Sequence, residues 1–202
     1  MEGILFYWVG WFYWIIVTFF VSKNNMNRMK LAIWLLLCII FSIRRIDLFS
    51  SSFSLSSFFI ILTVYCLASK YSWKKRLYFL ISSFIVMLSY VSMLMFEIFD
   101  PVLLIFPREW LFPLLLTYCV FLMYNDTKMR ILTLLSGTVH GEILFSFIVK
   151  KLTSGYTVGS LSYLDVVAIT TAFILLWNGI EKTATYFNHH FSQIEKEKEK
   201  TS

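Results

Sequence analysis

The sequence predicts an all-α protein, a polytopic transmembrane helical bundle of about seven spans. Of its 202 residues, 58% are hydrophobic and only 15% are charged, whereas soluble domains carry about 25% charged residues. The apolar residues form continuous runs and do not alternate with polar ones as they do in membrane β-barrels. Helices are therefore expected, because they satisfy their own backbone N–H and C=O groups in lipid.

Seven segments approach the roughly 20 mostly apolar residues that a span needs. They are Ile4–Val21, Leu31–Ile43, Phe53–Ser69, Leu77–Phe99, Trp110–Tyr124, Ile131–Val149 and Leu164–Ile180. The second is short and gains length only from Met29 and Lys30, whose side chain can extend to the interface. Six spans remain an alternative, in which the second and third segments form one re-entrant hairpin. The first segment is expected to be a retained helix, because a signal peptide opens with positive charge and here Glu2 leads.

The distribution of basic residues predicts an external N-terminus and a cytoplasmic C-terminus. With seven spans, thirteen of the 18 Lys and Arg residues fall on the side of the C-terminus, which satisfies the positive-inside rule. These thirteen are Lys23, Arg28, Lys30, Lys70, Lys74, Lys75, Arg76, Lys128, Arg130, Lys182, Lys196, Lys198 and Lys200. The chain is thus divided into a helical bundle at residues 1–185 and a charged cytoplasmic tail at residues 186–202.

Several classes of function are disfavoured. The net charge of +6 sits in short clusters between apolar runs, as expected at an anionic membrane surface and not for a nucleic-acid protein. The three cysteines lie far apart within apolar runs, so neither a disulfide framework nor a metal site is indicated. His189 and His190 in the tail are too weak a signal for a metal. No catalytic motif is visible, and we expect a protein that is not an enzyme and has no cofactor.

The sixth apolar segment contains the most informative polar residues. Gly137 and Gly141 form a GxxxG pair, which allows a neighbouring helix to approach closely. His140 lies on the same stripe of the helix, whereas Glu142 is about 200° further around it. A single-helix pair of His140 and Glu142 is therefore excluded. Ionisable residues at membrane depth are costly, so the two are candidates either for proton transfer or ligand contact, or for hydrogen bonding between helices.

Two arginines on the predicted outer side go against the charge rule. Arg44 and Arg45 could contact an anionic headgroup or substrate, or could pair with Asp47, Glu97 or Asp100 on the same side. The serine run that follows, from Ser50 to Ser57, is interpreted as a polar helix entrance, with a transport path as the alternative. Asp165 is expected to cap the last span.

Short segments along the chain resemble the YphA family. They are Met1–Trp8, the turn at Phe99–Val102, the pair Gly141-Glu142, and Tyr156–Ser160 followed by Leu164-Asp165. The family consists of small polytopic proteins of spore-forming Gram-positive bacteria. The resemblance implies a multi-pass protein of the bacterial cell membrane with a role in envelope or spore assembly. The family offers no established activity or catalytic residues to transfer.

Two hypotheses for the function follow, and an intramembrane enzyme ranks third. The first is a non-enzymatic membrane scaffold that contacts the lipid bilayer and other membrane proteins through its helices. The second is a small carrier for a proton-coupled or lipid-like substrate that uses Glu142 and His140. A polar cavity that reaches Glu142 would favour the carrier, and a dry bundle would favour the scaffold.

Overall fold

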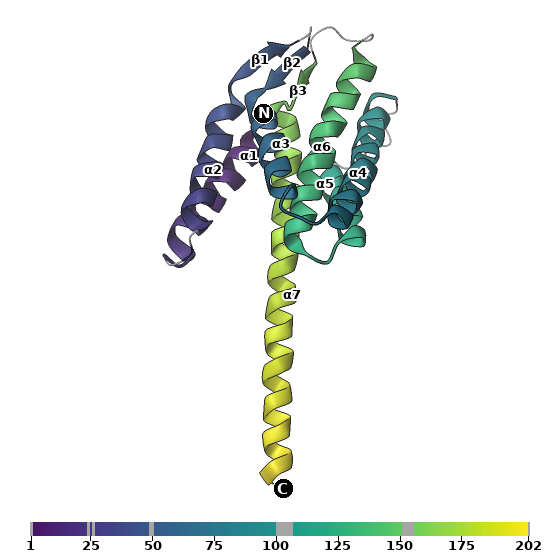
Figure 1. Cartoon of the computed structure of the whole chain (residues 1–202). Coiled ribbons are helices and arrows are strands. Elements are labelled where there is room, and N and C mark those ends of the chain that lie inside the picture. Colours follow the sequence, from purple (N-terminus) through teal and green to yellow (C-terminus); the bar gives the residue numbers. More distant parts are fainter. Residues whose placement is uncertain are drawn as a thin grey trace.

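A computed structural model describes residues 2–23, 25, 27–48, 51–99, 107–150 and 156–201. These residues form seven α-helices, one π-helical turn and three short strands (Figure 1). The helices are α1 (Ile4–Ile15), continued by the π-helix η1 (Ile16–Phe20), α2 (Asn27–Ser42), α3 (Leu55–Ala68), α4 (Trp73–Phe99), α5 (Arg108–Met123), α6 (Thr127–Val149) and α7 (Leu161–Thr201).

Each of the seven predicted apolar segments overlaps one helix or, for the first, α1 and η1, although the third segment begins at Phe53, two residues before α3. Among the described residues, α4, α6 and the stretch Leu161–Phe187 of α7 are long and apolar enough to cross a membrane. Two shorter apolar helices cover Ile4–Phe20 and Leu55–Ala68. The predominantly helical fold is thereby confirmed, while the number of spans stays a prediction.

A small sheet, which the sequence analysis did not predict, joins two connections between helices. Strand β1 (Arg45–Leu48) pairs antiparallel with β2 (Ser51–Ser54), and β2 pairs in parallel with β3 (Thr157–Val158). Within the serine run, Ser51–Ser54 therefore form a strand, and Ser54 is also the N-cap residue of α3. Ser56 and Ser57 do lie in the first turn of α3, where both are buried.

Helix α6 lies at the centre of the bundle, between α3, α4, α5 and α7 (Figure 1). The GxxxG pair faces α4. A Cβ atom added at Gly137 would lie 2.6 Å from the Cβ of Val86 and 2.9 Å from the carbonyl oxygen of Ser83. Such distances are too short for any side chain, so glycine is what allows the two helices to approach this closely.

The last helix begins at the same end of the bundle as the sheet and extends far beyond the other helices at the opposite end (Figure 1). It passes residue 185 without a break, so the predicted tail continues the last helix as far as Thr201. That residues 1–185 lie in the membrane and residues 186–202 in the cytoplasm stays a prediction.

Asp165 does not cap its own helix, contrary to the prediction, because α7 already begins at Leu161. Its carboxylate instead accepts hydrogen bonds from the backbone N–H groups of Gly3, at 2.6 Å, and Phe6, at 2.7 Å. Asp165 is 4% exposed. It therefore satisfies otherwise unpaired N–H groups at the start of α1 and attaches that helix to α7.

Substitution of the central glycine tests the packing of α4 on α6. Gly137→Leu should lower the free energy of unfolding in detergent by about 2 kcal/mol or more, because the new side chain overpacks a filled contact. Gly179→Leu is the matched control, since a Cβ at Gly179 meets nothing within 4 Å. Equal melting temperatures of the two variants would contradict this packing.

Candidate functional site

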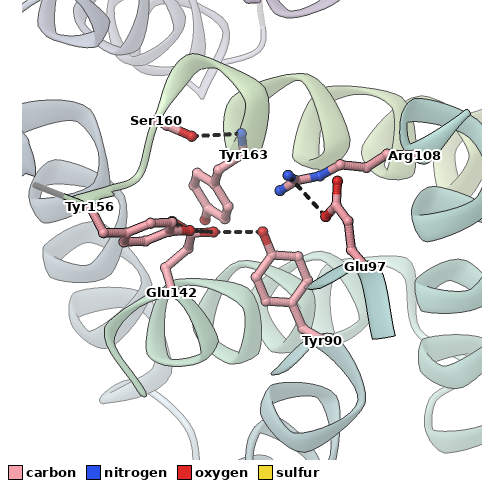
Figure 2. A network of polar contacts seen from close by, with 7 residues as sticks. All are labelled: Tyr90, Glu97, Arg108, Glu142, Tyr156, Ser160 and Tyr163. Atoms are coloured by element: carbon pink, nitrogen blue, oxygen red, sulfur yellow. Dashed lines mark hydrogen bonds and ion pairs between the residues drawn. The ribbon is translucent and has the colours of Figure 1, made fainter. Parts of the chain in front are cut away.

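The candidate site is centred on Glu142, which lies in the last third of α6 and is completely buried. The helix projects its side chain toward the space between α4 and the connection from α6 to α7 (Figure 2). A carboxylate in such a position has lost its water and is stable only if other groups donate hydrogen bonds to both oxygens.

Three groups from two other parts of the chain meet this requirement. The hydroxyl of Tyr90 on α4 donates to Oε1 of Glu142 at 2.7 Å. The hydroxyl of Tyr156 lies 3.0 Å from each carboxylate oxygen, and the backbone N–H of Gly159 donates to Oε2 at 3.0 Å. Figure 2 shows Glu142 held between the two tyrosines. Both oxygens are thus satisfied by the protein itself.

Two glycines make this convergence possible. A Cβ at Gly141 would lie 2.7 Å from Cδ1 of Tyr90, so the tyrosine ring passes directly over the glycine to reach Glu142. Gly159 has φ +74, and a Cβ there would lie only 1.8 Å from the hydroxyl oxygen of Ser57. Glycine tolerates this backbone conformation and leaves room for the serine.

An ion pair flanks the site on the side of Tyr90 (Figure 2). The guanidinium of Arg108, at the start of α5, lies 3.2 Å from the carboxylate of Glu97 on α4 and 5.3 Å from the ring centre of Phe112. It is also close enough to interact electrostatically with Glu142. Glu97, which was one of the partners considered for Arg44 and Arg45, is therefore paired with Arg108.

Tyr156 lies outside the predicted spans, in the connection before α7. Burial, and then the charge of the adjacent Glu142, raise the pKa of Tyr156. Its hydroxyl therefore keeps its proton at neutral pH and acts as a hydrogen-bond donor to Glu142. The site contains an acceptor surrounded by donors, an arrangement that stabilises a negative charge or a shared proton without further groups.

His140 belongs to a separate contact. Its Nε2 lies 3.0 Å from the hydroxyl of Tyr65 on α3, and its Nδ1 lies 2.6 Å from the carbonyl oxygen of Ser136. Because a carbonyl only accepts, Nδ1 donates the hydrogen bond to Ser136, and Nε2 forms the second hydrogen bond with the hydroxyl of Tyr65. His140 therefore links α6 to α3, while Glu142 links α6 to α4 and to the connection before α7.

Arg44 and Arg45 lie at the start of the β1–β2 hairpin, and neither makes a hydrogen bond to Glu142 through its side chain. Arg44 ends the turn after α2 and Arg45 begins β1, and both side chains are exposed. Neither makes an ion pair among the residues that the structure describes. The side chain of Asp47 and the whole of Asp100 lie outside the described residues, so pairing with them stays a prediction.

Sequence reasoning singled out Glu142 but missed its partners. Tyr90, Tyr156 and Gly159 come from elements that are 52, 14 and 17 residues away, and no helical periodicity links them. The one available signal was the stretch Tyr156–Ser160, which was noted for its family resemblance and not for chemistry.

In the described part of the chain, no three His, Cys, Asp or Glu side chains are grouped in a way that could hold a metal. Two surface hollows, of about 380 and 310 Å³, are lined by neither Glu142 nor its hydrogen-bond partners. The site thus connects segments of the protein, and neither of these hollows leads to it.

The fold and the site define a helical integral membrane protein in which a buried carboxylate is held by its own chain. The model for YphA-like integral membrane proteins matches residues 2–200, so the chain belongs to this family, and the resemblance noted from the sequence is confirmed. The uncharacterized protein YphA of Bacillus subtilis (strain 168) is 28% identical over 195 residues, which cover 96% of this chain and 92% of that relative. No solved structure matches the chain.

Removal of the carboxylate should destabilise the fold more than its replacement by an amide. Glu142→Leu leaves the donors at Tyr90 and Gly159 without partners, and each unpaired buried donor costs roughly 1–3 kcal/mol. Glu142→Gln can accept from Gly159 and donate to a tyrosine hydroxyl, so its cost should stay within about 1 kcal/mol. Thermal unfolding in detergent measures both, and a leucine variant as stable as the parent would refute the structural role.

Proposed function

We propose that the protein is a non-enzymatic scaffold of the bacterial cell membrane, which acts through contacts of its helices with other membrane proteins. The observation that carries this proposal is the closed environment of Glu142. Its carboxylate is completely buried, and both oxygens are bound by the protein's own donors. A carrier would need this group to exchange a proton or contact a substrate during transport, and the contacts instead hold three segments together.

The proposed role of the protein is in envelope or spore assembly, and its proposed location is the cell membrane. This part of the proposal rests on family membership alone, since the chain belongs to a family of integral membrane proteins. The small size of the connections between helices supports a role that needs no extramembrane domain.

The proposal includes seven spans, an external N-terminus and a cytoplasmic C-terminus. The N-terminus lies at the end of the bundle that carries the sheet, and the C-terminus lies at the other end (Figure 1). The connections that follow η1, α3 and α5 all lie at the end of the bundle opposite the sheet (Figure 1), and together with the first turns of α2, α4 and α6 they carry nine of the 18 Lys and Arg residues. This arrangement supports the orientation because Lys and Arg are retained in the cytoplasm.

Reporter fusions test the orientation. A fluorescent reporter after Ser202 should be active in the cytoplasm, and an alkaline phosphatase placed before Glu2 behind an export signal should be active outside. The control is a phosphatase fused after Ser72, in the connection between α3 and α4, which should be inactive. An external C-terminal reporter would contradict seven spans and favour six.

Proteoliposomes test the scaffold against the carrier. The parent protein and Glu142→Gln should give the same proton leak as empty vesicles when a pH gradient is imposed. The two should also capture the same membrane proteins when cross-linked in native membranes and purified. A proton flux that appears with the parent and disappears with Glu142→Gln would overturn the scaffold proposal and establish the carrier.

A further inference from the structure

A pocket at the end of the bundle opposite the sheet combines apolar walls with exposed cations. Its volume is about 380 Å³. The connection between α3 and α4 forms one side of it, and the turn between α5 and α6 forms the other. No part of the Glu142 site contributes to it, and only its placement on the cytoplasmic side rests on the orientation proposed above.

The walls of this pocket are aromatic and held in place by contacts of their own. Tyr78 donates a hydrogen bond from its hydroxyl to the carbonyl oxygen of Met123 at 2.9 Å. Its ring meets that of Tyr124 edge to face, with the ring centres 5.1 Å apart. Tyr71 and the buried Met129 complete the apolar lining. Such walls suit hydrocarbon and glycerol, and they provide few partners for a hydrated inorganic ion.

The rim of the pocket is positively charged. Lys74 and Lys75, in the first turn of α4, are exposed, and neither makes an ion pair among the described residues. Asp126 also lines the rim, but its carboxylate accepts from the backbone N–H of Lys128 at 3.4 Å and caps α6. Two lysines and one aspartate leave the rim with a net positive charge.

The neighbouring residues are typical of the interface between membrane and water. Trp73 is 72% exposed, and the guanidinium of Arg76 lies 5.4 Å from the centre of its ring. Tryptophan is enriched at the level of the headgroups. These residues indicate that the pocket lies at the level of the lipid headgroups.

We propose that this pocket binds an anionic glycerophospholipid, with the phosphate between Lys74 and Lys75 and the glycerol region against Tyr71 and Tyr78. Free phosphate shares the charge of this ligand but would leave the apolar walls uncovered. Basic pockets between helices on the cytoplasmic side are a recurrent means of binding lipid headgroups.

Native mass spectrometry of the purified full-length protein tests the proposal. The protein in detergent is titrated with phosphatidylglycerol, with phosphatidylcholine, and with inorganic phosphate. The parent should retain phosphatidylglycerol about 25-fold better than phosphatidylcholine, since each of the two lysines contributes roughly fivefold when it lies near an anionic group. The double variant Lys74→Gln and Lys75→Gln should lose this preference, and millimolar phosphate should not displace the lipid from the parent.

The double variant Lys23→Gln and Lys30→Gln is the matched control, because it removes two exposed lysines from the same end of the protein outside the pocket. It should retain the preference of the parent, and all variants should melt at the same temperature. Three results would overturn the proposal: equal retention of the two lipids by the parent, unchanged retention in Lys74→Gln and Lys75→Gln, or displacement of the lipid by phosphate.

Discussion

The carboxylate of Glu142 imposes the strictest condition on this structure. A buried carboxylate has at least two acceptor atoms to satisfy and no water to satisfy them. The protein meets the condition with a side chain from α4, a side chain from the α6–α7 connection, and one backbone N–H from the same connection. One acidic residue thereby fixes the relative positions of three segments that are distant in sequence.

The same physical principle recurs at Asp165. Its carboxylate binds two backbone N–H groups at the start of α1, more than 150 residues away in the chain. Glu142 and Asp165 together hold the end of the bundle that carries the small sheet. Both acids are nearly or completely buried, so their partners are as necessary to the fold as the apolar contacts between the helices.

Glycines determine where these polar contacts can form. Gly137 and Gly141 allow α4 to lie against α6. Gly141 also leaves space for the ring of Tyr90, whose hydroxyl binds Glu142. Gly159 adopts a backbone conformation that a side chain would strain, and it exposes its N–H to the carboxylate. The positions of these glycines therefore explain both the close packing of the helices and the hydrogen-bond network.

The helices could be predicted from the sequence because long apolar runs in lipid leave the backbone few alternatives. Glu142 could be singled out because a charge within such a run is costly. The sheet could not be predicted, because its strands have only four, four and two residues and because β3 pairs with β2, which lies about 100 residues earlier in the chain. Tyr90 and Tyr156 could not be assigned to Glu142, because tyrosine is common in this chain and only the packing of helices selects these two.

Hydrogen–deuterium exchange at the amide of Gly159 tests the central role of Glu142 most directly. The bond from this amide to a buried carboxylate should slow its exchange on the order of a hundredfold or more relative to an unstructured loop. Glu142→Leu should remove that protection, whereas the amides in the middle of α4 should remain slow. Exchange of Gly159 at the rate of a free loop in the parent protein would contradict the account.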